Sequence, residues 1–422
     1  MDLDPNRLLI DADELQRHID ELGAIGQDPR TGGLWRGVYT PVWRQAVDQV
    51  RRWLEEAGLS TRLDAVGNLW GRLEGSEPGP AVLTGSHVDT VPQGGKYDGA
   101  LGIHASLAAV KALQQAFGQP RRSLEILVIC DEEGGRFRSD FWGARAVIGA
   151  IRPGEAEERR DLEGVTIAEA MRQAGFDPAR IPEARRDDVA AWLELHIEQG
   201  GTLEAEGLDI GVVHTITGHR QQRVRVYGRQ DHAGTTPMDI RRDAMAGAAE
   251  MIQHALGVAE RMGRPTVATV GRVDAEPGAT NVVPGLVSFT LDLRDADAAR
   301  LAVLCGEIDR FNTECAARRG LRVERELFMD RMPVPLTPAL QDLLAQQATR
   351  AGLRWKSMPS MAGHDSEIMV ERWPSGMLFV PSHDGRSHTP AEFTPIEQVV
   401  PGVRVLAAAL YQLAYSPAGS PG

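Results

Sequence analysis

Continuous apolar runs and amphipathic stretches alternate along most of the chain. Apolar runs cover residues 81–83, 124–130, 190–197 and 376–381, as is typical of strands buried on both faces of a sheet. The stretches around them repeat their apolar positions with a helical period. This alternation predicts an α/β fold with a mixed sheet flanked by helices. Helices are predicted over residues 11–22, 46–57 and 396–415, after the strand at residues 81–83, and from residue 336.

The pattern changes near residue 214. Residues 223–227 and 286–294 alternate apolar and polar side chains, as half-exposed antiparallel strands do. Helical patterns cover residues 243–262 and 298–318, and a further strand fits residues 322–328. These segments predict a small α+β sandwich inserted into a larger domain. The predicted division is residues 1–213 for the first part of the larger domain, 214–331 for the insert and 332–422 for the second part.

Two regions carry weaker signals. Residues 23–40 are rich in glycine and predict a long loop. Long ordered loops are often functional, although a plain surface connection explains this composition equally well. Residues 153–188 are charged, predict mostly helix and contain no obvious site.

Composition and charge narrow the range of partners and cellular locations to be expected. The formal net charge is −13, which argues against a nucleic-acid or anionic-membrane partner. The 3 cysteines show no C-x-x-C spacing, as expected in a reducing compartment. We see no secretory signal, and no apolar run reaches the roughly 18 residues that a membrane span needs. We therefore expect a soluble, cytoplasmic protein.

Polar side chains with metal-binding chemistry stand just beyond the apolar runs. The carboxyl ends of the strands in an open α/β sheet form the edge where ligands bind, so these side chains can lie close together. Histidine and carboxylate ligands suit Zn, Mn, Co or Ni. The residues are His87, Asp89, Asp98, Glu132, Glu133, His196 and His388.

This set is large enough for two metal ions. Two ions about 3.5–4 Å apart need a bridging carboxylate and further ligands on each side. Asp98 is the candidate bridge, and Glu133 is the second carboxylate. His87, together with His388 or His196, would complete the ligands of each ion.

Two carboxylates remain outside this ligand set. Asp89 can orient the imidazole two residues before it. Glu132 stands beside a ligand but is itself free, which makes it the candidate general base for the attacking water. Each residue alone also has an ordinary explanation, such as a solvated acidic turn, a core histidine at His196 or a loop histidine at His388. Together these explanations require several independent coincidences, all at strand ends.

A series of segments resembles the successive motifs of the M20-type metallo-amidohydrolases. The similarity is greatest to the hydantoinase/carbamoylase branch, which includes N-carbamoyl-L-amino-acid amidohydrolases, β-ureidopropionases and allantoate amidohydrolases. The resemblance covers residues 15–415 in the order of the family. The segments are GSHVDTVPQGGKYDGALG, DEEGGRF, LELHIEQG, DHAGTTPM, NVVP with DLR, AGHD and DGRSHTPAE.

The resemblance implies a catalytic α/β domain interrupted by a smaller α+β lid that also dimerises. It implies two divalent metal ions, with His87, Asp98 and His196 as ligands and Asp98 as the bridge. Glu133 and His388 match the remaining ligands. Mn or Zn is the expected metal, and Co or Ni also fits these ligand types.

The resemblance also assigns the base, the substrate groups and one backbone feature. Glu132 matches the general base, and a cis peptide is expected at Asp98–Gly99, although such a bond costs about 3–4 kcal/mol. A planar arginine fork suits the carboxylate of a ureido substrate, and histidine or asparagine can donate to a developing oxyanion. In the family, the histidine of this set reaches into the neighbouring site of a homodimer. The matching positions are Gln199, His232, Asn281, Arg294, Gly363 and His364.

A few positions depart from the family pattern. Ala144 stands where serine is frequent, Ser366 where alanine is common, and Arg386 where a small or apolar residue is usual. The segment 141–143, Phe-Trp-Gly, is similar to that of some allantoate amidohydrolases. These changes leave the metal residues intact, so they bear on the substrate rather than on the reaction class.

The implied reaction is hydrolysis of the ureido C–N bond of an N-carbamoyl-L-amino acid to the amino acid, CO2 and ammonia. The nearest alternative is an allantoate amidohydrolase with the same chemistry. A dipeptidase or aminoacylase of the wider superfamily fits less well, because Gln199, His232, Asn281 and Arg294 together resemble the carbamoylase branch. A non-catalytic binding protein on the same fold is the alternative from another class. It would lack a ligand or the base, and this sequence has the complete set.

Overall fold

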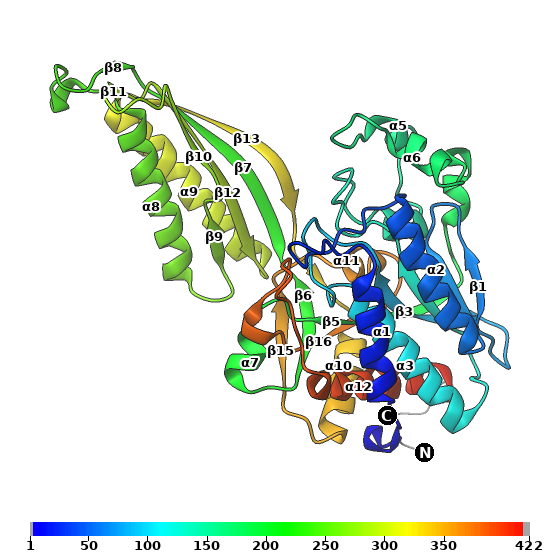
Figure 1. Cartoon of the computed structure of the whole chain (residues 1–422). Helices are drawn as coiled ribbons and strands as arrows, with labels where there is room; N and C mark the ends of the chain where they lie inside the picture. Colours follow the sequence, from blue (N-terminus) through cyan, green and yellow to red (C-terminus); the bar gives the residue numbers. More distant parts are fainter. Residues whose placement is uncertain (1–2, 417–422) are drawn as a thin grey trace. The chain divides into compact units, whose positions relative to one another are not determined.

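The computed structural model describes residues 3–416. The chain divides into two compact units (Figure 1). The first unit contains the residues up to His214, Leu336–Met358 and the residues from His364 onward. The second unit contains Thr215–Pro335 and Pro359–Gly363.

A large mixed sheet forms the centre of the first unit. Its strands are β1 (Ser60–Leu63), β2 (Leu69–Leu73), β3 (Ala81–His87), β4 (Leu124–Ile129), β5 (Val189–Ile197), β6 (Ile210–Ile216), β15 (Trp355–Ser360) and β16 (Ser375–Val380). The order across the sheet is β1-β2-β4-β3-β5-β16-β6, and β15 also pairs with β6. The central strands β4, β3, β5 and β16 run parallel, whereas β2 and β6 pair antiparallel with their neighbours.

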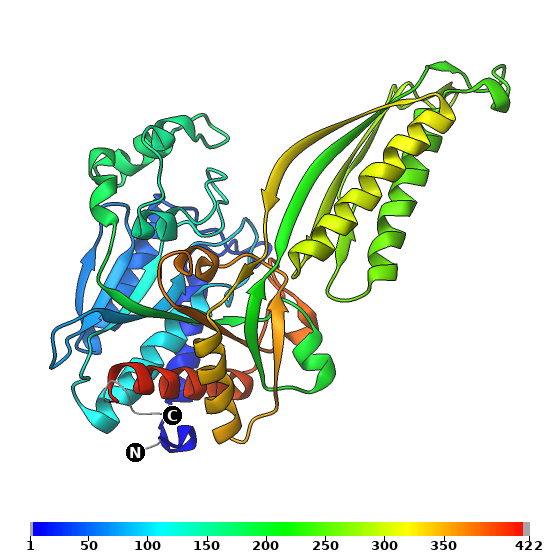
Figure 2. The same cartoon turned by 180° about the vertical axis from the view of Figure 1, so that it is seen from behind.

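Helices cover both faces of this sheet (Figures 1 and 2). They are η1 (Pro5–Arg7), α1 (Ala12–Ala24), α2 (Pro41–Glu56), α3 (Ala100–Phe117), α4 (Trp142–Ile148), α5 (Glu155–Glu158), α6 (Ile167–Gln173), η2 (Pro178–Ala184), α7 (Thr202–Glu206), α10 (Pro338–Arg350), α11 (Asp365–Met369), η4 (His383–Gly385) and α12 (Ile396–Ala414). One hydrophobic cluster joins the sheet to α1, α2, α3, α10 and α12, and another joins its opposite face to α4 and α11. The predicted fold class is therefore confirmed.

The packing of β3 explains its continuous apolar sequence. All of its residues are buried. Val82 packs in the cluster on one face and Leu83 in the cluster on the other, because successive side chains of a strand point in opposite directions. A strand with helices on both faces has no solvated side to carry polar residues.

The second unit places two long helices on one face of an antiparallel sheet. Its elements are β7 (Gly218–Tyr227), β8 (Asp231–His232), η3 (Met238–Ile240), α8 (Ala244–Met262), β9 (Val267–Thr269), β10 (Val273–Glu276), β11 (Val282–Val283), β12 (Leu286–Asp295), α9 (Ala298–Arg319), β13 (Arg322–Arg331) and β14 (Val334–Pro335). The sheet order is β10-β12-β7-β13, with β9 beside β12. The apolar positions of β12, including Phe289 and Leu291, are buried with residues of α8 and α9. The predicted α+β sandwich is therefore present.

Some sequence predictions differ from the structure. Residues 153–188 contain only the short helices α5, α6 and η2, because Gly164 adopts positive φ in the turn between α5 and α6, and Gly175 adopts positive φ just after α6. Strands β6 and β15 were not predicted. Among residues 3–416, no helix is both long enough and apolar enough to cross a membrane.

Candidate active site

The candidate site lies where the strand order of the large sheet reverses. From β3 the chain continues to β4 on one side, and β5 then pairs with the other side of β3. In open α/β sheets such a reversal leaves a crevice beyond the carboxyl ends of the strands, where ligands bind. His87 ends β3, Glu132 and Glu133 follow β4, His196 lies near the end of β5, and His388 follows β16. The structure thus brings the predicted metal-binding residues to one edge.

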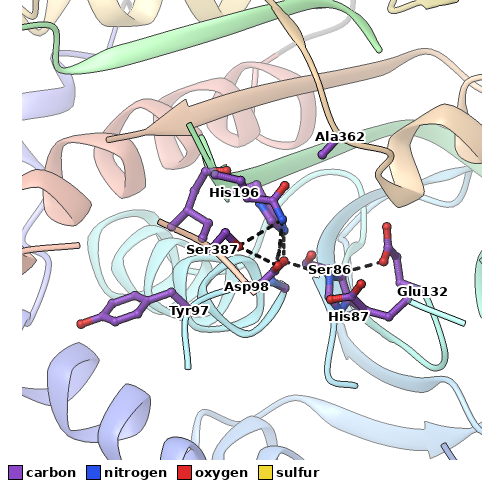
Figure 3. A network of polar contacts seen from close by, with 12 residues as sticks. Ser86, His87, Tyr97, Asp98, Glu132, His196, Ala362 and Ser387 are labelled. Carbon is purple, nitrogen blue, oxygen red and sulfur yellow. Dashed lines mark hydrogen bonds and ion pairs between the residues drawn. The ribbon is translucent and has the colours of Figure 1, made fainter. Parts of the chain in front are cut away.

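Asp98 lies at the centre of this group (Figure 3). Its Oδ1 is 3.2 Å from Nε2 of His196 and 3.6 Å from Nε2 of His87. Its Oδ2 is 3.1 Å from Nε2 of His388. One carboxylate therefore faces histidines on both of its oxygens, which is the arrangement that a bridging ligand needs.

Glu132 and Glu133, which follow β4, lie beside different histidines of the group around Asp98. Oε2 of Glu132 is 3.9 Å from Nε2 of His87, and Oε1 of Glu133 is 3.6 Å from Nε2 of His388. Burial raises the pKa of the Glu132 carboxyl well above its usual range, and it raises the pKa of Glu133 to about 7. The hydrogen bond to Asp98 raises the pKa of His388 to about 9.

The residues fit divalent metal ions. Donor atoms of His87, Asp98 and His196 lie within 4.8 Å of one another, and so do those of Asp98, Glu133 and His388. The two groups share Asp98, as a dinuclear centre requires. Oε1 of Glu133 is buried and has no hydrogen-bond partner among the described residues, so a ligand position is open there. Buried carboxylates at this density need positive charge nearby, which metal ions would supply.

Two of the histidines present the nitrogen that a metal needs. Nδ1 of His87 donates to the backbone carbonyl of Asp89 at 3.2 Å, and Nδ1 of His196 donates to that of Ile197 at 2.9 Å. This tautomer leaves the lone pair on Nε2, which faces Asp98. The backbone N–H of Gly99 donates to Nε2 of His196 at 3.1 Å, in agreement with this assignment.

The Asp89 carboxylate has a different contact from the one expected. It lies 3.7 Å from Nδ1 of His87, too far for a hydrogen bond. Its two oxygens instead accept the backbone N–H groups of Glu132 and Glu133, each at 3.1 Å. Asp89 therefore fixes the backbone of the candidate base and of one candidate ligand.

Gln199 and His364 also lie at the centre. Nε2 of Gln199 donates to Oδ2 of Asp98 at 2.8 Å, and its Oε1 is buried without a partner among the described residues. The His364 ring centroid is 4.5 Å from that of His196. Glu194, which was not predicted, forms a further group with these two histidines within 4.8 Å.

The backbone is strained at several of these strand ends. Asp131, Gln199 and His388 have φ values of 55°, 59° and 56°, a conformation that costs free energy for residues other than glycine. Gly99 has φ 66°, and a Cβ there would lie 2.3 Å from Cε1 of His87. The Asp98–Gly99 bond is not among the cis peptides of the described chain, which precede Pro265 and Pro277, so the expected cis bond is absent. The trans form is the less costly isomer before a glycine.

The remaining predicted substrate residues belong to the second unit. His232 in β8 pairs with Val282 in β11 and is exposed, and the carbonyl of Asn281 accepts the N–H of Ala233 at 3.0 Å. Asn281 and His232 thus lie at the same small two-stranded antiparallel sheet. Gly363 ends the short segment 359–363.

Arg294 is held within the second unit by a carboxylate and a carbonyl. Its Nε donates to Oδ1 of Asp292 at 2.9 Å, and its Nη1 donates to the carbonyl of Met361 at 2.7 Å. Asp292 also accepts from His219 and Gln221, and these hydrogen bonds together with Arg294 lower its pKa. The guanidinium is therefore pre-oriented.

Two residues that sequence reasoning missed support Asp98. Oε1 of Glu392 accepts the backbone N–H of Tyr97 at 2.8 Å and that of Asp98 at 2.9 Å. The Ser387 hydroxyl lies 2.8 Å from Oε2 of Glu392 and 3.1 Å from Oδ2 of Asp98. The sequence signal for Glu392 is weak, because it is a single glutamate in a polar loop. Its only indication is its position four residues after the candidate ligand His388.

The departures from the family pattern are mostly core positions. Ala144 is fully buried, and Trp142 donates from Nε1 to the hydroxyl of Tyr39 inside the core. The Ser366 hydroxyl donates to Oε2 of Glu194 at 2.6 Å and accepts from Nε1 of Trp192 at 2.9 Å. Only Arg386 is exposed.

Sequence comparison assigns the class of this protein. The profile described as "Peptidase family M20/M25/M40" matches residues 83–412, and the chain belongs to this family. It is a hydrolase of the amidohydrolase branch that includes carbamoylases and allantoate amidohydrolases.

Particular relatives agree with this class. The chain is 40% identical to "Allantoate amidohydrolase" of Escherichia coli strain K12 over 395 residues, which cover 93% of this chain and 96% of that protein. It is also 40% identical to "N-carbamoyl-L-amino acid amidohydrolase" of Geobacillus stearothermophilus over 409 residues, 96% of this chain and 99% of that protein. A solved amidase of the hydantoinase/carbamoylase family from Burkholderia multivorans is 32% identical, with a TM-score of 0.91 and coverage of 97% and 99%.

Proposed function

We propose that this protein hydrolyses the ureido C–N bond of N-carbamoyl-L-amino acids and releases the L-amino acid, CO2 and ammonia. The observation that carries the proposal is the position of Asp98 between His196 and His388, which suits two divalent ions. When bound, the ions would polarise the ureido carbonyl and lower the pKa of water. His87, Asp98 and His196 would hold one ion, and Asp98, Glu133 and His388 the other.

Glu132 is the proposed general base. It is buried beside His87, with its Oε2 3.9 Å from Nε2 of that histidine. It would take a proton from the attacking water and pass it to the nitrogen of the breaking C–N bond. Asp89 would keep the base in place through the backbone N–H of Glu132.

Each predicted substrate-binding residue has its own proposed role. Arg294 is proposed to bind the substrate carboxylate with its planar fork. Gln199 and His364 would contact the ureido group from the metal side, since they lie against Asp98 and His196. His232 and Asn281 would donate to the developing oxyanion. We propose a homodimer in which His232 serves the neighbouring site, and its exposed position is compatible with this role.

Allantoate is the second candidate substrate. The similarity to the Escherichia coli allantoate amidohydrolase is as high as that to the Geobacillus carbamoylase. The Phe-Trp-Gly segment carries little weight in this choice, because Trp142 is buried in the core. A dipeptidase or aminoacylase has less support, since the named relatives above act on ureido compounds.

Ammonia release from a small substrate panel tests the proposal. The panel contains N-carbamoyl-L-methionine, its D-isomer, β-ureidopropionate, allantoate, ureidoglycolate and a dipeptide, each with added Mn and again after chelation. Chelator-sensitive release from the L-carbamoyl amino acid is the expected result. Release from allantoate alone would make allantoate the substrate and leave the proposed mechanism unchanged. A metal-loaded protein that acts on no ureido compound would overturn the proposal.

A further inference from the structure

Arg36 is a fully buried arginine in the glycine-rich segment 23–40. Its Nε donates to the carbonyl of Val88 at 2.7 Å, and its Nη1 donates to the carbonyl of Leu22 at 3.3 Å. Its backbone N–H donates to Oγ1 of Thr90 at 3.0 Å. Nη2 is buried and has no hydrogen-bond partner within residues 3–416.

The charge of Arg36 is not neutralised by a direct ion pair. Within the described residues, its guanidinium hydrogen bonds go to backbone carbonyls rather than to a carboxylate. Burial lowers the pKa of Arg36 to about 10, opposed by the nearby carboxylates of Asp89 and Glu392. The side chain is therefore cationic at neutral pH. Arginines are almost never fully buried without a paired charge, so this position needs an explanation.

The segment that Arg36 binds carries a candidate ligand and its neighbour. Val88 lies between His87 and Asp89, and its N–H donates to the carbonyl of Ile129 at 3.2 Å. The Val88 residue is thus fixed on its N–H side by the end of β4 and on its carbonyl side by Arg36. The direction of the His87 imidazole and of the Asp89 carboxylate depends on this backbone.

The same glycine-rich segment also binds the loop that leads to Asp98. The backbones of Leu34 and Gly94 exchange two hydrogen bonds, each of 3.0 Å. Gly33 allows this approach, because a Cβ there would lie 2.8 Å from Cα of Gln93. Segment 23–40 therefore contacts the chain just after the candidate ligand His87, at Val88 and Thr90, and again before Asp98, at Gly94.

We propose that Arg36 is a positioning residue for the metal centre, which fixes residues 87–90 and thereby places His87 and the Asp89 carboxylate. Through Asp89, the effect extends to the backbone of Glu132 and Glu133. This inference rests on the proposed function, because it requires that the centre holds metal ions. Arg36 touches no candidate ligand side chain, so its contribution is geometric.

Metal affinity tests the proposal, with the half-buried Arg186 as control. Arg186 donates from Nη1 to Glu125 at 2.9 Å and lies over the Trp70 ring at 4.7 Å. Glu125 stands at the start of β4, whereas the candidate ligand His87 pairs with Ile129 at its end, about 13 Å further along the strand at 3.3 Å per residue. Arg186→Met therefore removes an arginine that makes several side-chain contacts at the other end of the strand.

The measurement is Mn and Zn binding to the metal-free full chain by competition with a chromogenic chelator, together with the thermal midpoint. Arg36→Met should weaken metal binding about 10- to 100-fold, as loss of a supporting contact does in other metal sites. Arg36→Lys keeps the charge but not the fork, so a smaller loss is expected. Arg186→Met should lower the midpoint and leave metal affinity at the wild-type value.

Wild-type metal affinity in Arg36→Met would overturn the proposal, and so would an equal loss in Arg186→Met. If Arg36→Met does not fold, Arg36→Lys decides, since wild-type affinity in that variant has the same meaning. The binding assay contains no substrate. A wild-type protein that binds two ions but hydrolyses no ureido compound would therefore contradict the proposed function alone, and one that binds none would overturn both.

Discussion

Glu392 accepts the backbone N–H of Asp98 at 2.9 Å, although 294 residues separate the two in the chain. The same carboxylate accepts the N–H of Tyr97 and lies against the Ser387 hydroxyl, which reaches the side chain of Asp98. Glu392 thus holds Asp98 in two ways: it binds the Asp98 backbone N–H directly, and it contacts the Asp98 carboxylate through the Ser387 hydroxyl. A Cβ on Gly95 would lie 2.3 Å from Oε1 of Glu392, so this contact also requires glycine nearby.

Replacement of Glu392 should weaken metal binding according to the hydrogen bonds that it retains. Glu392→Ala leaves two backbone N–H groups without their acceptor, and about a 10- to 100-fold loss of metal affinity is expected. Glu392→Gln keeps an acceptor oxygen for both N–H groups, so its loss should be smaller. Chelator competition measures both variants. Equal losses would mean that Glu392 supports metal binding through its negative charge rather than through its hydrogen bonds to the backbone.

Replacement of Glu132 by glutamine should stop turnover and leave the metal ions in place. Loss of a general base reduces the rate by about 10²- to 10⁴-fold. Metal analysis of the dialysed Glu132→Gln protein serves as the control, because the change is close to isosteric and Glu132 is not needed as a ligand. Activity near that of the wild type would exclude Glu132 as the base.

Asp98 and His388 should differ in the number of ions that their loss releases. Asp98 belongs to both candidate ligand groups, whereas His388 belongs to one. Asp98→Ala should therefore bind neither ion tightly, and His388→Ala should retain the ion held by His87 and His196. Calorimetric titration of the metal-free proteins gives the stoichiometries. One tight ion remaining in Asp98→Ala would contradict a bridging role.

Ser366→Ala should destabilise the protein without changing its substrate preference. The hydroxyl donates to Glu194 and accepts from Trp192, and all three side chains are fully buried. Loss of these bonds leaves buried polar atoms unpaired, which costs about 1–3 kcal/mol. Urea unfolding measures this cost, and the ratio of kcat/KM values for N-carbamoyl-L-methionine and allantoate should stay constant. A changed ratio would place Ser366 in the specificity of the site.

His104 should contribute an acid-dependent loss of stability. Both of its ring nitrogens are buried without partners among the described residues, and burial lowers its pKa to about 3. The unfolded chain binds a proton near pH 6.5 and the folded chain does not, so stability falls as the pH drops from about 6.5 towards 3. At pH 5.5 the loss is about 1.4 kcal/mol.

The variant His104→Leu removes this titration. The difference in unfolding free energy between wild type and variant, measured by urea unfolding, should shift by about 1.4 kcal/mol in favour of the variant between pH 7.5 and pH 5.5. A pH-independent difference would show that His104 is paired with water or becomes protonated in the folded protein.

The strands and the candidate ligands follow from the sequence because both have local signals. A strand covered on both faces is apolar throughout, as β3 is, and polar residues directly after it are unusual enough to notice. In the same way, His87 and His196 stand at strand ends, and the parallel sheet brings those ends together. The structure therefore places the predicted side chains around Asp98.

The supporting residues lack such signals. Glu392 and Arg36 act on backbone groups of segments far along the chain, and only the folded structure shows which groups these are. Asp89 was assigned to the nearest histidine, whereas its carboxylate binds the loop after β4. The helix content of residues 153–188 is lower than predicted, because the charged, helix-favouring residues there are interrupted by Gly164 and Gly175.

The order of the candidate ligands along the chain has a consequence for biosynthesis. His87, Asp98 and His196 all precede the second unit, whereas His388 follows it and depends on β16, which pairs with β5. The ribosome therefore delivers the two halves of the centre at different times, with the whole second unit made in between. The first three ligands can meet while synthesis continues, but the second position stays incomplete until β16 is released and pairs. Ion uptake during maturation is thus expected to be sequential, with the His388 position filled last.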